Sequence, residues 1–136
     1  QSKSAVSLLG KATQALTSAR VLLDLGDVDG ACNRAYYAMF DAARAALIQA
    51  GHQIGKTHKG VLALFSEQFV KPGLVTKEVG KSLKKAETFR YVADYDSASV
   101  NHSDAQELVT LAQDFVNLVR SELMPQAPSG NTPPKG

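Results

Sequence analysis

The chain has 136 residues, of which 44% are hydrophobic and 21% charged, and its net charge is only +2. This length allows one domain with one core, and the composition is typical of a globular protein rather than a disordered or fibrous one. Asp41 and Arg44 interrupt the longest apolar stretch, which excludes a membrane span there. The single cysteine, Cys32, excludes an intramolecular disulfide. No signal-peptide pattern opens the chain, so we expect a cytoplasmic protein.

Apolar residues recur at helical spacing through most of the chain, and no run alternates as a strand would. The pattern predicts five helices, at about 4–25, 28–50, 57–69, 76–93 and 103–123. Residues that favour helix starts stand at the beginning of four of them: Asp27 or Asp29, then Thr57 and Thr76, and finally Ser103, which forms a capping box with Gln106. The short connections favour an all-α fold, an antiparallel up-and-down bundle of four to five helices.

The last residues differ in composition from the rest. Four of the five prolines lie between Pro125 and Pro134, together with Ser129 and Gly130. Such a segment has too little apolar surface to fold. We therefore expect a helical bundle over 1–124 and a disordered Pro/Gly-rich tail over 125–136.

The predicted second helix is the expected centre of the bundle. Six small residues fall on one side of it, namely Ala31, Ala35, Ala38, Ala42, Ala45 and Ala46. Tyr36 and Phe40 fill an adjoining side. Two apolar sides on one helix predict burial against several partners, and a second subunit is one of the alternatives.

On the predicted fourth helix, Arg90 continues the apolar stripe formed by Val79, Leu83 and Ala86, and Asp94 lies beside it. Both side chains should therefore turn toward the core. The simpler interpretation is an ion pair one turn apart, but base before acid is the weaker order for such a pair. An acid near a helix C-terminus also opposes the helix dipole. These points favour a polar site, with a structural hydrogen-bond network as the alternative.

The second helix also has a polar side, on which Arg34, Tyr37, Asp41 and Arg44 lie together. A solvated face with an Asp41–Arg44 pair accounts for part of it. A tyrosine hydroxyl beside a guanidinium also suits phosphate or ribose oxygens. Asn33 precedes Arg34 and is placed to orient either group.

Positive charge is concentrated in one part of the chain. Residues 56–90 contain eight basic and three acidic side chains, a net +5, which leaves −3 for the remainder. A local basic patch indicates a polyanionic partner. Charge alone also fits a solvated helix face.

His52, His58 and His102 have spacings that match no zinc pattern. We expect each of them to be a surface or capping residue, and Cys32 to be a small core residue. No glycine-rich phosphate loop follows a strand. The sequence thus predicts neither a metal nor a cofactor.

Three segments, 33–43, 56–61 and 90–95, together resemble the HEPN superfamily, helical domains often found beside minimal nucleotidyltransferases. The resemblance covers about 4–123. It implies a bundle of four or five helices that is usually dimeric. Many members are metal-independent ribonucleases, often toxins restrained by the nucleotidyltransferase. Their signature is an arginine followed, after four to six residues, by a histidine. Arg90 matches the arginine, but Tyr95 stands where the histidine is expected.

On this resemblance, the protein is expected to be a module that binds a nucleotide or RNA, the toxin-like half of a pair with a minimal nucleotidyltransferase. The binding candidates are Asn33, Arg34, Tyr37 and Arg90. A first alternative is a weak metal-independent ribonuclease in which Arg90 stabilises the phosphorane and Asp94 or Tyr95 moves protons. A second is a non-catalytic assembly module, in which the polar residues fix helix register and the alanine face makes a homodimer.

Overall fold

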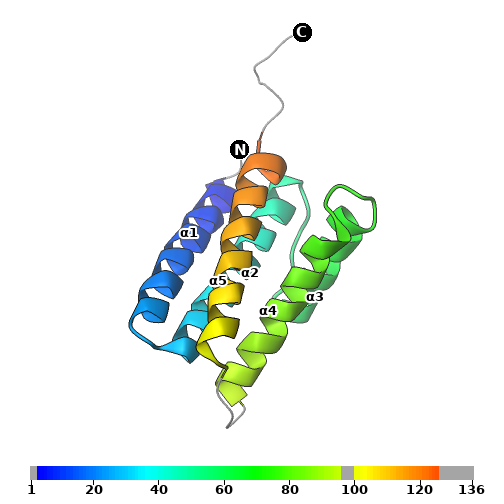
Figure 1. Ribbon diagram of the computed structural model, residues 1–136. Helices are drawn as coiled ribbons and strands as arrows, with labels where there is room; N and C mark the ends of the chain where they lie inside the picture. The colour runs from blue at the N-terminus through cyan, green and yellow to red at the C-terminus, as the bar shows by residue number, and fades with distance from the viewer. Residues whose placement is uncertain (1–2, 96–99, 126–136) are drawn as a thin grey trace.

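Five α-helices make up the computed structural model, which describes residues 3–95 and 100–125 (Figure 1). They are α1 (Lys3–Asp24), α2 (Val28–Gln49), α3 (His58–Phe65), α4 (Lys77–Tyr95) and α5 (His102–Leu118). π-Helical turns extend α3 as η1 (Ser66–Val70) and α5 as η2 (Val119–Leu123). The four long helices run alternately down and up in Figure 1, and the described residues contain no strand. The predicted all-α, up-and-down bundle is confirmed.

Two of the predicted helix starts are confirmed at their capping residues. The side chain of Asp27 accepts a hydrogen bond from the backbone N–H of Gly30 at 2.9 Å, and Thr57 accepts one from Gly60 at 3.0 Å. A Cβ at Gly60 would lie 2.7 Å from the Thr57 hydroxyl oxygen, so this cap favours glycine in the first turn of α3. Thr57 thereby sets where α3 begins and places His58 at its first position.

The predicted N-cap of the last helix was wrong. Asn101, rather than Ser103, is the N-cap of α5, because its side-chain oxygen accepts a hydrogen bond from the backbone N–H of Asp104 at 2.8 Å. Asn101 has extended backbone angles, as an N-cap requires. The helix therefore begins at His102.

α2 is the centre of the bundle and packs against each of the other four α-helices. The six alanines of its small face are all 0% exposed within the single chain. Small side chains let neighbouring helices approach closely, and the chain's own helices take up that space. The prediction that this face makes a homodimer is therefore wrong.

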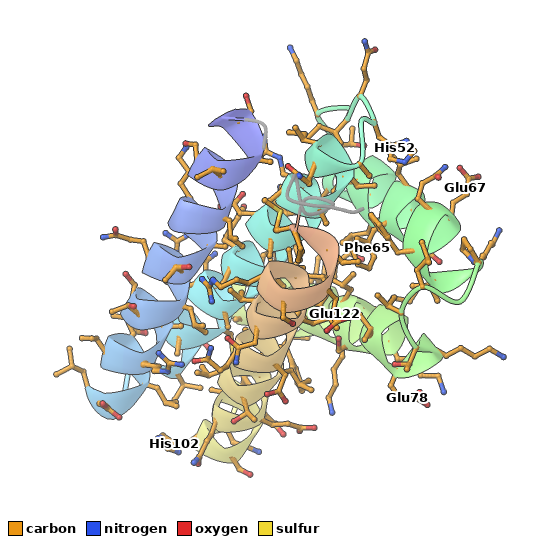
Figure 2. All side chains as sticks on the ribbon, turned by 90° about the horizontal axis from the view of Figure 1, so that it is seen from above. His52, Phe65, Glu67, Glu78, His102 and Glu122 are labelled. Atoms are coloured by element: carbon orange, nitrogen blue, oxygen red, sulfur yellow. The ribbon has the colours of Figure 1, made fainter. Side chains whose placement is uncertain are left out.

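Aromatic rings join the short third helix to the rest of the core. The Phe65 ring centroid lies 4.9 Å from that of Phe69 and 5.4 Å from that of Phe115 on α5. Figure 2 shows Phe65 directed into the bundle and Glu67 directed away from it. Cys32 is fully buried, and burial raises the pKa of its thiol to about 11. Its place in the core is as predicted, and the raised pKa means that the thiol stays protonated.

No helix in the described ranges combines the length and apolarity needed to span a membrane. The tail predicted to be disordered lies outside the described residues from position 126 onward.

Candidate functional site

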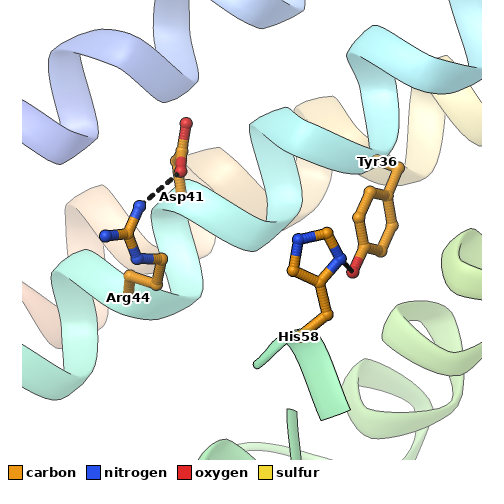
Figure 3. Close-up of polar contacts among 4 residues, drawn as sticks. All are labelled: Tyr36, Asp41, Arg44 and His58. Carbon is orange, nitrogen blue, oxygen red and sulfur yellow. Dashed lines mark hydrogen bonds and ion pairs between the residues drawn. The ribbon is translucent and has the colours of Figure 1, made fainter. Parts of the chain in front are cut away.

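The segment 51–57 leads the chain back along α2, so that α3 begins beside the middle of that helix (Figure 1). His58 therefore meets three aromatic rings of α2. Its ring centroid lies 4.4 Å from that of Phe40 and 5.6 Å from those of Tyr36 and Tyr37. The Tyr36 hydroxyl and His58 Nδ1 are 3.1 Å apart and form a hydrogen bond (Figure 3).

His58 is thus half-buried, and the prediction that it is a surface or capping residue was wrong. Helical periodicity gives no indication of this contact, because the path of 51–57 sets which part of α2 the residue meets. The Thr57 cap and the segment 56–61 were the available signals. They placed His58 in the first turn of a helix but did not show what it would face.

Arg90 turns inward, as predicted. Its guanidinium carbon lies 5.1 Å from the centroid of the Tyr36 ring, and its side chain is only 16% exposed. The guanidinium also donates a hydrogen bond to Asp94 at 3.1 Å, so the ion pair one turn apart is present as well. The same side chain therefore joins α4 to the aromatic residues of α2.

Two more arginines lie against rings of the same group. The Arg34 guanidinium is 5.4 Å from the Tyr37 ring centroid, and that of Arg44 is 5.6 Å from the Phe40 centroid. Arg44 also pairs with Asp41 at 3.1 Å, as predicted (Figure 3). We call the whole set the arginine–aromatic cluster; it comprises Arg34, Tyr36, Tyr37, Phe40, Arg44, His58 and Arg90. A cation–π contact with its ring stabilises each guanidinium in place.

Two of these arginines carry buried donors that are not used. The Nε–H groups of Arg34 and Arg90 have no hydrogen-bond partner among the described residues. A buried donor without a partner costs about 1–3 kcal/mol. A guanidinium matches phosphate or carboxylate oxygens in a two-bond fork. The cluster therefore presents donors of the kind that an anion would satisfy.

The surroundings of Arg90 keep it charged. Burial alone lowers its pKa, but the hydrogen bond with Asp94 and the neighbouring Tyr37, Tyr36 and Tyr95 outweigh burial and raise the pKa. Arg90 is thus a fixed positive charge at the centre of the cluster.

His58 and Tyr36 are both held in their neutral forms. Burial lowers the pKa of His58, and the positive charges of Arg90 and Arg44 lower it further, against smaller opposing effects of nearby carboxylates. Burial raises the pKa of Tyr36 well above its ordinary value. The hydrogen-bonded pair at neutral pH is therefore an imidazole and a phenol, both uncharged.

The other predicted site residues lie at the edge of the cluster. Tyr95 is the last residue of α4, is 68% exposed, and has its ring centroid 5.0 Å from that of Tyr91. Asn33 is half-buried on α2. The structure thus brings Arg34, Tyr37 and Arg90 into one cluster and adds His58, whereas Tyr95 faces largely outward.

A groove of about 730 Å³ runs between α3, η1 and α4. Its apolar lining includes Leu62, Phe65 and Leu83, and Glu87 also lines it. Five of its lining residues are lysines, namely Lys59, Lys71, Lys77, Lys81 and Lys84. We call this the lysine groove. It adjoins the arginine–aromatic cluster, because Lys59 follows His58 and the charge of Glu87 acts on both His58 and Tyr36.

A second hollow, of about 720 Å³, lies between α1 and α2 and is lined by Gln14, Ser18, Arg34 and Asp41. Arg90 and His58 line neither hollow. Within the described ranges, no three His, Cys, Asp or Glu side chains gather as a metal-ligand set.

Comparison with known proteins places this arrangement in a family. The model of the HEPN domain matches residues 5–122. A UPF0332 protein of Gloeobacter violaceus is 35% identical over 113 residues, which cover 82% of this chain and 89% of the relative. A UPF0332 protein of Thermotoga maritima is 33% identical over 110 residues, or 80% and 83% of the two chains. A Methanocaldococcus jannaschii protein named "Putative toxin MJ0605" is 29% identical over 117 residues, or 86% and 87%. This chain belongs to the HEPN domain family.

Proposed function

We propose that the protein is a HEPN-type module that binds RNA through its phosphates and acts as the toxin-like half of a pair with a minimal nucleotidyltransferase. Two relatives from Methanocaldococcus jannaschii that carry the name "Putative toxin" support the toxin-like part. The arginine–aromatic cluster supports the binding part. The homodimer implied by the family resemblance and the cytoplasmic location stay predictions.

One observation carries the binding proposal: Arg90, buried against Tyr36, keeps an Nε–H without a partner among the described residues, and so does Arg34 against Tyr37. A phosphate that reached such a guanidinium would satisfy a donor that is already desolvated. Tyr37, half-buried on α2, offers a ring on which a base can stack.

The lysine groove supports an RNA strand over a free nucleotide. A mononucleotide is only long enough to occupy the arginine–aromatic cluster. An RNA strand held there can continue over Lys59 toward Lys77, Lys81 and Lys84. Lysines at such spacing neutralise successive phosphates without reading the bases. Asp94 orients Arg90 through their hydrogen bond.

Fluorescence anisotropy with a labelled single-stranded RNA tests the proposal, with unlabelled nucleoside monophosphate as the competing ligand. We expect the RNA to bind, and the mononucleotide to compete only weakly because it cannot occupy the lysine groove. Tight binding of the mononucleotide alone would assign the cluster to a nucleotide rather than to RNA. Binding of neither ligand would contradict the proposal.

Neutralising the groove should weaken RNA binding and reduce its dependence on salt. For Lys77→Gln, Lys81→Gln and Lys84→Gln combined, the slope of log affinity against log salt should fall by about 2, since each single-strand phosphate contact contributes about 0.7. The matched control is Lys85→Gln on the same helix, because Lys85 already pairs with Glu107 outside the groove. An equal change in slope for the control and the triple variant would argue against the groove as an RNA path.

The partner is tested separately. Co-expression with a minimal nucleotidyltransferase should yield a complex and relieve any slowing of growth that this chain causes alone. Failure of both would remove the partner from the proposal while leaving RNA binding to stand on its own measurement.

A further inference from the structure

We propose that the hollow between α1 and α2 binds a guanine base of the RNA, and that Asp41 is the residue that selects guanine. This rests on the proposed function, because Arg34 must hold a phosphate of the same strand. The hollow would thus add a choice of base to arginines and lysines that contact only phosphates.

Arg34 joins this hollow to the arginine–aromatic cluster. Its guanidinium lies 5.4 Å from the centroid of the Tyr37 ring, and its side chain also lines the hollow. Tyr37 in turn meets Tyr36 edge-on, with ring centroids 5.3 Å apart, and Arg90 lies on the Tyr36 ring. A strand whose phosphate is held by Arg34 therefore has a base beside the hollow.

The charges in the hollow do not suit a second phosphate. Arg34 and Lys11 share it with the carboxylate of Asp41, whose side chain is only 16% exposed. Figure 3 shows this carboxylate directed toward α1, away from the hydrogen-bonded Tyr36 and His58. A phosphate placed there would meet a largely buried negative charge. The carboxylate instead fits an uncharged group that carries N–H donors.

Asp41 has acceptor capacity to spare for such a group. Arg44 pairs with its Oδ1 at 3.1 Å, which leaves the lone pairs of Oδ2 for a ligand. An ionised carboxylate offers about four lone-pair positions in all. The ion pair therefore holds the carboxylate in place without using it up.

Guanine is the base that matches a carboxylate. Its N1–H and 2-amino donors stand side by side on one edge, with no acceptor between them. Adenine and cytosine place a ring-nitrogen acceptor beside their amino group, and uracil has a carbonyl on each side of its N3–H. Guanine also carries the O6 and N7 acceptors, which suit a lysine such as Lys11. Unstacked bases of single-stranded RNA are read on these edges.

Helix α1 leaves room for a flat ring. The hollow of about 720 Å³ has the size of a small-ligand site, and Gln14 and Ser18 add hydrogen-bonding side chains to it. Gly10 also lines it, and a Cβ there would have no contact within 4 Å outside the backbone of its own helix. Glycine inside a helix is destabilising relative to alanine, and packing within the described chain does not require it here. Close approach of a ligand is a physical reason for it.

The test measures the anisotropy of labelled oligouridine RNAs that differ at one internal position, which carries guanosine, inosine, adenosine, cytidine or uridine. We expect the guanosine strand to bind roughly ten- to hundred-fold more tightly than the adenosine, cytidine and uridine strands, as for a well-made pair of base hydrogen bonds. Inosine lacks only the 2-amino group, so its strand should lose most of this preference. Equal affinities for the guanosine and adenosine strands, or for the guanosine and inosine strands, overturn the inference.

Two variants should abolish the preference by different routes, measured as the ratio of guanosine-strand to uridine-strand affinity. Asp41→Asn replaces one of the two acceptor oxygens with a donor, and Gly10→Leu fills the hollow from α1 without changing a charge. Asp24→Asn is the matched control, because it removes the same charge from an exposed position at the end of α1. It should keep the preference.

A preference retained in Asp41→Asn or in Gly10→Leu overturns the role of the hollow. Should Asp41→Asn not fold, Gly10→Leu and the inosine strand decide. Strands that bind equally whatever base they carry overturn the guanine site and leave phosphate binding standing. Binding of none of the strands contradicts the proposed function itself, and the guanine site with it.

Discussion

Arg90→Ala is expected to weaken RNA binding by roughly one to two orders of magnitude, because charged hydrogen bonds of this kind contribute about 1.5–3 kcal/mol. The variant removes the buried guanidinium that lies on Tyr36, together with its unused donor. Arg90→Lys keeps the charge but loses the planar fork, so its affinity should fall between those of the wild type and the alanine variant. Anisotropy titrations at one fixed salt concentration measure all three.

Arg20→Ala is the matched control, because Arg20 is an exposed arginine on α1 outside the cluster. It removes the same charge from the protein and should change RNA affinity little. Thermal melting of each variant separates loss of the site from loss of the fold. If Arg90→Ala lowered the melting temperature yet bound RNA as well as the wild type, Arg90 would be a register-fixing residue of an assembly module.

Tyr36→Ala is expected to lower the free energy of unfolding by about 3–5 kcal/mol, the usual range for removing a buried aromatic side chain. Tyr36 is fully buried. Its ring stacks on Phe40 with centroids 5.9 Å apart and contacts His58 and Arg90. Tyr36→Phe keeps the ring and removes only the hydrogen bond to His58, so it should cost about 1 kcal/mol. Urea unfolding followed by circular dichroism measures both values.

Tyr91→Ala provides the comparison on α4. Its side chain is 61% exposed, and surface substitutions usually stay within about 0.5 kcal/mol of the wild type. Equal losses of stability for Tyr36→Ala and Tyr91→Ala would mean that the ring at position 36 is not a core residue. A Tyr36→Phe variant that lost as much as Tyr36→Ala would mean that the hydroxyl, not the packing, stabilises this region.

Local signals predicted most of the fold. Helical spacing of apolar residues and the caps Asp27 and Thr57 predicted all five helix starts to within one residue, because these signals act within one turn. The N-cap of α5 was misassigned because Asn101 and Ser103 are both good N-caps. Which one is used depends on how the helix packs, and that information is not local.

The same distinction applies to the site. The inward turn of Arg90 followed from its place on an apolar stripe, which is a property of one helix. The partner of His58 depends on the path of 51–57 past α2, so periodicity could not reveal it. The alanine face was predicted to be apolar, but the sequence could not show that the chain's own helices cover it completely.

The Nε–H groups of Arg90 and Arg34 report most directly on whether these guanidinia hold a phosphate. Their ¹H–¹⁵N NMR signals can be followed while single-stranded RNA is added, with Arg20 as the internal reference. We expect the signals of Arg90 and Arg34 to shift strongly at saturation and that of Arg20 to stay in place. RNA that binds without moving the signals of Arg90 and Arg34 would contradict the assignment of the arginine–aromatic cluster as the phosphate site.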